Sequence, residues 1–301
     1  MFSILSCQSL DLSASLNTST HILNAKHVQV ASTALTTNMG ATRKEMLQQC
    51  GLLRYKVPTP HYNRSLPTYV LVLGVEGSGH HLIAEFAPHL FCTNKVVRYL
   101  PGFHLVGNRA AFVDRNVSEI RQDVGLFLQS NLGGKGILFD TQESFPEGGP
   151  YRVTRHPEVQ SIAALDGVVA NVRFVTLLRS PIMALVSQHR RFGHKERKDP
   201  ALEAAVTAHE LTWLQRLVEE IPTRMNLLLP YPLMKMQPEE TMRRLGIFLQ
   251  CQYKLRELKP HPSFGDHVLT RRWKNINTFF RKNMRKWKDI DPSNSCNVSR
   301  L

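Results

Sequence analysis

Four short apolar runs punctuate the chain, each bounded by glycine, proline or charged residues. They occupy residues 68–75, 136–141, 172–178 and 224–231. Their hydrophobic residues follow one another instead of alternating with polar ones, which is the pattern of strands buried on both faces of a sheet. We therefore predict four buried strands at these positions.

Amphipathic segments separate these runs. The clearest is 201–221, where one face is hydrophobic: Leu202, Val206, Trp213 and Leu217. Segment 237–250 starts with Pro238 and two glutamates, as the first turn of a helix does, and continues with an apolar stripe. Segment 80–90 follows the first strand, and Pro88 ends or bends it. Strands that alternate with helices predict an α/β fold, in which a parallel sheet is flanked by helices on both faces.

Residues 1–60 differ in composition from the rest. This segment is rich in Ser, Thr, Ala and Asn, and Asp11 is its only acid before Glu45. Such a sequence is typical of a disordered extension or of an organelle-targeting segment. A proline-containing linker follows it. We predict one globular domain over residues 66–291 and a flexible tail over residues 292–301.

Charge and cysteine content narrow the choice of partners. The chain has 301 residues and a formal net charge of +14, which favours a nucleotide, a nucleic acid, an acidic polymer or an anionic membrane. The five cysteines include no CxxC pair and predict no zinc site, although one disulfide is compatible with them. No apolar stretch approaches the roughly 18–20 residues that span a bilayer, so we expect no transmembrane anchor in this chain.

The sequence GVEGSGHH, residues 74–81, directly follows the first predicted strand and opens the first predicted helix. Gly74, Gly77 and Gly79 allow backbone N–H groups to converge on an anion, and Ser78 adds a hydroxyl. The loop lacks the final Lys and Ser or Thr of the nucleoside triphosphate pattern GxxxxGK[ST]. A tight turn without a ligand is the alternative interpretation.

Two histidines end this loop. His80 or His81 can donate a hydrogen bond to a phosphate or sulfate oxygen, and so replace part of the function of the missing lysine. A metal site is the weaker interpretation, because no further ligand follows with a recognisable spacing. We predict that these residues neutralise charge on a bound anion and that no metal is required.

A second anion-binding constellation follows the third predicted strand. That strand is predicted to end at Leu178, which places Arg179 at its carboxyl end, where ligands bind in open α/β sheets. Ser180 can cap the next helix, and Pro181 suits the first helical position. Ser187 lies about two turns further on, so that Arg179 and Ser187 can hold one phosphate between them.

These residues resemble a pattern of the sulfotransferases that use 3′-phosphoadenosine 5′-phosphosulfate (PAPS). In that family a strand runs into Arg-x-Pro, a Ser follows eight residues after the Arg, and the Arg and Ser bind the 3′-phosphate of the donor. Arg179, Pro181 and Ser187 match this pattern and its spacing. The loop 74–81 matches the position of the family's 5′-phosphosulfate loop.

Two later segments resemble the same family, so that the resemblance spans residues 66–290. Residues 227–249 resemble its strand, Pro-Glu-Glu and helix segment, and residues 280–290 resemble the basic stretch that closes over the donor. One departure is that the family's loop usually carries a Lys or Arg where this chain has Gly77. A further departure is that the late basic stretch lacks the glycine often found before its Trp, with Asn283 nearby instead.

The resemblance implies a P-loop-NTPase-like sheet and a metal-free transfer of a sulfuryl group from PAPS to a hydroxyl acceptor, first of all a carbohydrate. An anionic glycan or an acidic protein would suit the basic charge. The implied donor-binding residues are Gly74, Gly77, Ser78, Gly79, His80, Arg179, Ser187, Arg281 and Lys288. His80, His81, Arg281 and Lys288 are the candidates for neutralising the charge on the leaving phosphate. Carbohydrate and tyrosyl-protein branches of the family act in the Golgi lumen, and a plastid or the cytoplasm is the alternative location.

An acceptor hydroxyl needs a base that takes its proton. Asp140 and Glu143 follow the second predicted strand, and we favour Glu143 as the base. His104 is the weaker candidate. A solvent-exposed loop carboxylate without a catalytic role is the alternative interpretation.

Two other functions remain compatible with the sequence. A P-loop nucleotide kinase or NTPase would use the same glycine loop, but the missing GK[ST] argues against it. Residues 271–289 interleave aromatic with basic residues, as binders of nucleic acids or other polyanions do. A non-catalytic polyanion binder is therefore the third hypothesis, and no feature indicates a specific nucleic-acid sequence.

Overall fold

The computed structural model describes residues 55–92, 97–99, 117–140, 147–149, 152–155, 159–189 and 200–254. The predicted extension, the tail and the basic segment 271–289 lie outside these residues, apart from the end of the extension at residues 55–60.

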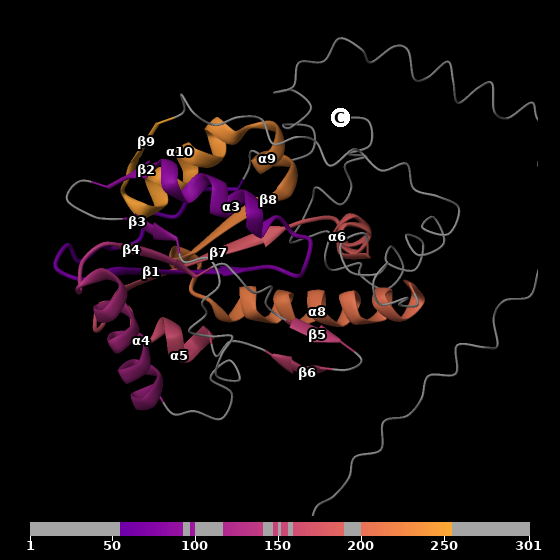
Figure 1. The fold of residues 1–301 in the computed structure, drawn as a ribbon, viewed down its shortest axis with the longest axis horizontal. Helices are drawn as coiled ribbons and strands as arrows, with labels where there is room; N and C mark the ends of the chain where they lie inside the picture. Colours follow the sequence, from indigo (N-terminus) through magenta and orange to yellow (C-terminus); the bar gives the residue numbers. More distant parts are fainter. Residues whose placement is uncertain are drawn as a thin grey trace, which may run out of the picture. The chain divides into compact units, whose positions relative to one another are not determined.

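A five-stranded parallel sheet forms the centre of the described fold, with the strand order β3-β4-β1-β7-β8 (Figure 1). The strands are β1 (Thr68–Leu73), β3 (Val97–Tyr99), β4 (Ile137–Asp140), β7 (Asn171–Leu178) and β8 (Asn226–Pro230). The four apolar runs are confirmed as strands. The short edge strand β3 was not predicted.

One face of the sheet is covered by α3 (His80–Phe86), α9 (Tyr231–Met236) and α10 (Pro238–Leu249). Their apolar side chains form one core cluster with Val70, Val72, Ile137, Phe139, Val175, Leu177, Leu227 and Leu229 of the strands. Pro88 lies in a 3-10 turn, η2 (Ala87–His89), that ends α3 as predicted. Burial of these side chains provides the main driving force that holds this layer to the sheet.

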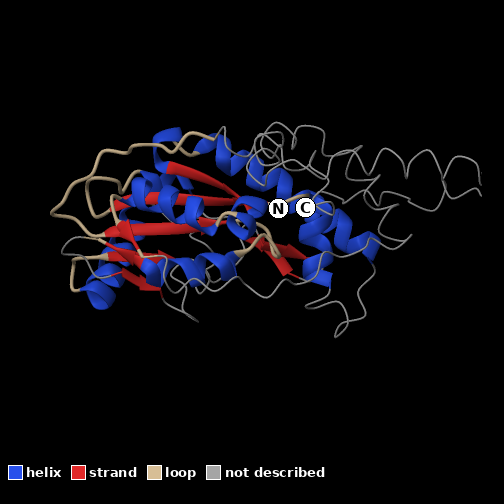
Figure 2. Ribbon diagram, turned by 90° about the horizontal axis from the view of Figure 1, so that it is seen from above, coloured by secondary structure: helices blue, strands red, loops and turns tan. Residues whose placement is uncertain are grey.

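The opposite face is covered by α4 (Val117–Leu132), α5 (Val159–Ala163) and α8 (Pro200–Glu220) (Figure 1). Figure 2 shows the helices and strands by colour in a view from above. Helix α6 (Pro181–Gln188) lies beyond the arrowhead of β7 and packs on α8 (Figure 1). Their core cluster includes the alternate side chains of the strands: Tyr69, Leu71, Leu73, Leu138, Val172, Phe174 and Leu178. The prediction of an α/β fold with helices on both faces is confirmed.

The buried face of α8 differs from the predicted one. Leu217 is buried, but Leu202 is 43% exposed, and Glu203 is buried in its place. Glu203 is accommodated because its Oε2 lies 2.6 Å from Nδ1 of His189, at the end of α6. Because Glu203 has a polar partner at the end of α6, the buried face at the amino end of α8 includes Glu203 and not the neighbouring Leu202.

Smaller elements complete the described fold. Strands β2 (Leu90–Phe91) and β9 (Gln252–Tyr253) form an antiparallel pair, and a disulfide joins Cys92 to Cys251 beside it. Strands β5 (Glu147–Gly149) and β6 (Arg152–Arg155) form a second antiparallel pair, and the 3-10 turn η5 (Thr223–Met225) leads into β8. A disulfide, with which the cysteine content is compatible, is therefore present among the described residues.

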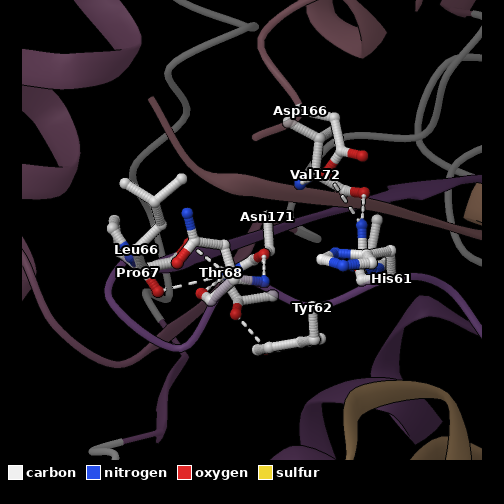
Figure 3. Close-up of polar contacts among 10 residues, drawn as sticks. His61, Tyr62, Leu66, Pro67, Thr68, Asp166, Asn171 and Val172 are labelled. Atoms are coloured by element: carbon white, nitrogen blue, oxygen red, sulfur yellow. Dashed lines mark hydrogen bonds and ion pairs between the residues drawn. The ribbon is translucent and has the colours of Figure 1, made fainter. Parts of the chain in front are cut away.

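A polar network attaches the linker to the amino ends of β1 and β7 (Figure 3). The Asn171 side chain accepts a hydrogen bond from the backbone N–H of Asn63 at 2.8 Å and donates to the carbonyls of Asn63 and Leu66. Arg173 is fully buried and lies 3.0 Å from Asp166 Oδ1, and it also donates to the carbonyl of His61. Side-chain amide and guanidinium groups thus satisfy the linker backbone where it meets the sheet.

Candidate functional site

The two predicted anion-binding segments meet at one edge of the sheet. Strands β1 and β7 are hydrogen-bonded neighbours, with Leu73 opposite Thr176. Because both strands run in the same direction, the loop after β1 and residue Arg179 after β7 emerge side by side. This is the edge at which ligands bind in open α/β sheets.

The glycine loop is shaped by two residues in the left-handed backbone region. Gly77 has φ +83° and Gly79 has φ +110°. A Cβ atom at Gly77 would lie 2.5 Å from the carbonyl oxygen of Ala184 in α6, and 3.2 Å from Cβ of Ser187. A residue with a side chain, such as lysine, therefore has no room at position 77 unless α6 shifts. The close packing of the loop on α6 thus explains why a glycine occupies this position.

Ser78 and His80 form the inner side of the loop. Ser78 is 1% exposed, and its N–H donates to the carbonyl of Val75 at 3.0 Å. The imidazole Cε1 of His80 lies 3.2 Å from the position that a Cβ of Gly74 would take, and His80 Nε2 is buried. His81 is exposed. The two histidines are thus not equivalent, and His80 is the one packed at the loop.

Arg179 points toward the glycine loop. Its Nη1 donates a hydrogen bond to the carbonyl oxygen of Gly77, and its guanidinium carbon lies 3.8 Å from the centre of the Tyr231 ring. Its Nε is buried and has no hydrogen-bond acceptor among the residues that the structure describes. Burial lowers the pKa of Arg179, an effect that Tyr231 partly opposes.

Ser187 is brought to the same place by α6. Pro181 occupies the start of this helix as predicted, whereas Ser180 stands at the N-cap position without a side-chain capping hydrogen bond. The backbone carbonyl of Ser180 instead accepts hydrogen bonds from the N–H groups of Met183 and Ala184 at 2.9 Å. The helix places Ser187 against Gly77, so that the loop, Arg179 and Ser187 form one cluster.

Tyr231 belongs to this cluster but was missed in the sequence. It is the first residue of α9 and directly follows β8, so it lies at the carboxyl edge of the sheet like Arg179. Its Cδ2 lies 2.8 Å from the position that a Cβ of Gly79 would take. An aromatic residue at the carboxyl end of a predicted parallel strand was the available signal.

Asp140 is the described carboxylate at the end of β4. It is 4% exposed, and its Oδ2 accepts a hydrogen bond from the Tyr69 hydroxyl at 2.7 Å. Burial raises the pKa of Tyr69 well above its ordinary value, and the neighbouring Asp140 adds to this effect. The other base candidates, Glu143 and His104, and the cations Arg281 and Lys288 lie outside the described residues.

Within the part of the chain that the structure describes, no group of three or more His, Cys, Asp or Glu side chains is arranged to hold a metal ion. No helix of the described segments is long and apolar enough to span a bilayer. A hollow of about 530 Å³ is lined by Lys56, Arg224 and Asn226 among others, at the amino end of β8 and away from the glycine loop.

Comparisons with known proteins give matches among solved structures alone, since no protein-family profile and no curated protein matches the sequence. The fold is similar to the sulfotransferase domain from the curacin biosynthetic pathway, at 15% identity over 66% of this chain and 79% of that chain, with a TM-score of 0.44. It is also similar to a sulfotransferase from Alicyclobacillus acidocaldarius, at 11% identity over 74% of this chain and 95% of that chain, with a TM-score of 0.45.

A third similar structure is the sulfotransferase domain from the Synechococcus PCC 7002 olefin synthase, at 13% identity over 77% of this chain and 91% of that chain, with a TM-score of 0.39. All three are sulfotransferases, the family that the sequence motifs resemble.

Proposed function

We propose that the chain is a sulfotransferase that binds PAPS between the glycine loop, Arg179 and Ser187 and transfers its sulfuryl group to a hydroxyl acceptor. The observation that carries this proposal is the Arg179 guanidinium. Arg179 is partly buried with its Nε fully buried, it reaches the backbone of the glycine loop, and its described contacts include no carboxylate.

A buried cation is costly unless an anion or hydrogen-bond acceptors compensate it. The described partners of Arg179 are the carbonyl of Gly77 and the ring of Tyr231, and neither carries a negative charge. A phosphate at this position would supply the charge and accept a hydrogen bond from the buried Nε. The site is therefore suited to an anionic ligand.

The contact between Gly77 and Ser187 supports a single ligand that touches all parts of the cluster. PAPS carries phosphate groups at two positions of one ribose, and so offers an anion to the loop and another to Arg179 and Ser187. We assign the 5′-phosphosulfate to the loop residues Gly74, Gly77, Ser78 and Gly79, and the 3′-phosphate to Arg179 and Ser187. Arg281 and Lys288 remain predicted donor contacts.

In the proposed reaction the acceptor oxygen attacks the sulfur, and the bond between sulfur and the bridging phosphate oxygen breaks. The acceptor proton passes to a base, and the products are a sulfate ester and 3′-phosphoadenosine 5′-phosphate (PAP). Backbone N–H groups of the loop and His80 would stabilise the charge that develops on the leaving phosphate. Glu143 stays the predicted base, because the described alternative Asp140 is engaged by Tyr69.

The basic charge of the chain favours an anionic acceptor, such as an acidic glycan or an acidic protein segment. A carbohydrate acceptor and residence in the Golgi lumen stay predictions from the family resemblance. The Cys92–Cys251 disulfide favours an oxidising compartment over the cytoplasm.

The proposal can be tested by calorimetric titration of the full chain with PAP in the presence of a metal chelator. We expect binding, and we expect Arg179→Ala to weaken it about 10- to 100-fold, because a charged hydrogen bond is worth about 1.5–3 kcal/mol. Ser187→Ala should weaken it by a smaller factor. Adenosine 5′-monophosphate, which lacks the 3′-phosphate, should lose much less from either substitution.

Arg216→Ala is the matched control, since Arg216 also stacks on an aromatic ring, that of Trp213, but lies on α8 away from the loop. It removes the same charge and should leave the affinity unchanged. Unchanged PAP affinity in both Arg179→Ala and Ser187→Ala would refute the site assignment. Strong binding of ATP that requires magnesium would favour the kinase hypothesis, and affinity that falls steeply with salt without preference for PAP would favour the polyanion binder.

A further inference from the structure

The ring of Tyr231 contacts both halves of the candidate site. Arg179 stacks over it, with the guanidinium carbon 3.8 Å from the ring centre. The same ring lies against Gly79, because a Cβ at that glycine would be 2.8 Å from Tyr231 Cδ2. One side chain from a third element therefore links the loop after β1 to the arginine after β7.

We infer that Tyr231 is a positioning residue that holds the Arg179 guanidinium at the glycine loop with its free N–H edge available to an anion. This inference rests on the proposed function, which assigns Arg179 to the binding of a donor phosphate. In this role Tyr231 does not contact the reacting atoms, and it acts through Arg179.

The stacking geometry explains how a ring can orient a cation without occupying its donors. A guanidinium over the face of an aromatic ring is attracted by the ring electrons, and its N–H groups point outward in its own plane. One of these groups, Nη1, donates to the carbonyl of Gly77. The Nε of the same group is buried and, within the described residues, has no acceptor. The plane is thus fixed while a donor remains for a ligand.

The backbone around Tyr231 makes the ring itself a fixed support. Pro230 precedes it with φ −66°, and Pro232 follows it, so that two pyrrolidine rings restrict the chain on both sides. Gly79 lies against one edge of the ring, since both Cδ2 and Cε2 of Tyr231 are within 3.3 Å of the position of a Cβ at this glycine. A ring held in this way reduces the number of orientations that Arg179 can adopt before a ligand binds.

A double-mutant cycle on the full chain tests the inference, with PAP affinity as the readout. Tyr231→Leu should weaken PAP binding about 3- to 30-fold, because it removes the ring face beneath the cation. Tyr231→Phe keeps the face and should restore the affinity to within about 2-fold of the unmodified chain. In the Arg179→Ala background, Tyr231→Leu should change the affinity less than about 2-fold, since its effect passes through Arg179.

Tyr253→Leu is the matched control, because Tyr253 is a partly buried tyrosine of the same layer that packs near Gly246 in α10. It should leave PAP affinity unchanged. If Tyr231→Leu weakens binding equally with and without Arg179, Tyr231 contacts the ligand directly and the positioning role is wrong. Loss of affinity in Tyr231→Phe would also overturn it.

Failure of the proposed function would be recognised separately. If the unmodified chain binds no PAP, the sulfotransferase proposal fails, and the same cycle is run with inorganic pyrophosphate by thermal shift. A non-additive loss of pyrophosphate affinity would then support the positioning role at an anion site of another function. Additive losses, or no binding of either probe, would overturn the inference as well.

Discussion

Arg173 lies in β7 and Arg179 directly follows this strand, and each stacks on a tyrosine, but their surroundings are opposite. Arg173, at the amino end, lies 3.0 Å from the carboxylate of Asp166, donates to backbone carbonyls and stacks on Tyr62. Arg179, at the carboxyl end, has one carbonyl and the ring of Tyr231. Burial lowers the pKa of both, but a carboxylate opposes this effect at Arg173 alone.

The contrast distinguishes an arginine that stabilises the fold from an arginine that is positioned to bind an anionic ligand. At the amino edge the charge is neutralised by the protein itself, and the network fastens the linker to the sheet (Figure 3). At the carboxyl edge the charge lacks such a partner within the described structure. An unneutralised buried cation is retained at a cost in stability, which is expected where it serves binding.

The largest expected effect concerns Arg173. Arg173→Met should lower the free energy of unfolding by about 3–5 kcal/mol, because it removes the cation paired with Asp166 and the donor to the carbonyls of Val172 and His61. Urea unfolding followed by circular dichroism measures this change. Arg216→Met, at an exposed arginine, should stay within about 0.5 kcal/mol of the unmodified chain. Equal stabilities of the two variants would refute the structural role of Arg173.

Gly77→Ala should have the next largest effect, about 2–3 kcal/mol of destabilisation. The new Cβ combines a strained φ of +83° with an approach of 2.5 Å to the carbonyl oxygen of Ala184. Gly167→Ala isolates the two causes, since Gly167 has φ +76° and open space around it. It should cost only about 1 kcal/mol. The packing of the loop on α6 would be unimportant if the two variants were equally stable.

Arg179→Met should change the free energy of unfolding by no more than about 1 kcal/mol in the ligand-free chain. The reason is that the lost hydrogen bond and ring contact are offset by removal of a buried, uncompensated charge. The measurement is the same urea titration, combined with PAP binding, which the substitution should weaken about 10- to 100-fold. A destabilisation as large as that of Arg173→Met would erase the distinction between the two arginines.

The smallest effect is a pH dependence at another arginine–carboxylate contact. Glu240 pairs with Arg243 and Arg244, and hydrogen bonding to Arg243 lowers the pKa of Glu240. Its stabilisation is therefore present above the unfolded-state pKa and is lost as the pH falls through the lower folded-state pKa. Glu240→Gln should cost about 0.5 kcal/mol at pH 7, since Arg243 is exposed, and the difference should shrink as the pH falls below about 4, the ordinary range of a glutamate, and disappear once the pH is below the lower folded-state pKa. A difference that does not shrink at all on acidification would contradict this assignment.

The sequence predicted the parts of the molecule that depend on local pattern. Continuous apolar runs identified four of the five strands of the central sheet. The glycine loop, Arg179 and Ser187 were found because each follows a strand at a recognisable spacing. Edge strand β3 spans only Val97–Tyr99, which is too short for such a pattern.

Features that depend on contacts between distant segments were not predictable. Tyr231 gains its role from Arg179 and Gly79, and the burial of Glu203 depends on His189 in another helix. Periodicity assigns a helix face by hydrophobicity alone, so it placed Leu202 inward and overlooked a buried carboxylate with a partner. The pairing of Cys92 with Cys251 likewise follows from tertiary proximity.

The Cys92–Cys251 bond has a consequence for the covalent connectivity of the chain. It closes a ring that contains β3, β4, β7, α6, α8, β8 and α9, and hence Arg179, Ser187 and Tyr231. A protease that cuts once anywhere between residues 93 and 250 would open this ring without releasing a fragment. A nicked chain should therefore migrate as one species on a denaturing gel until a thiol is added, and only then separate into two.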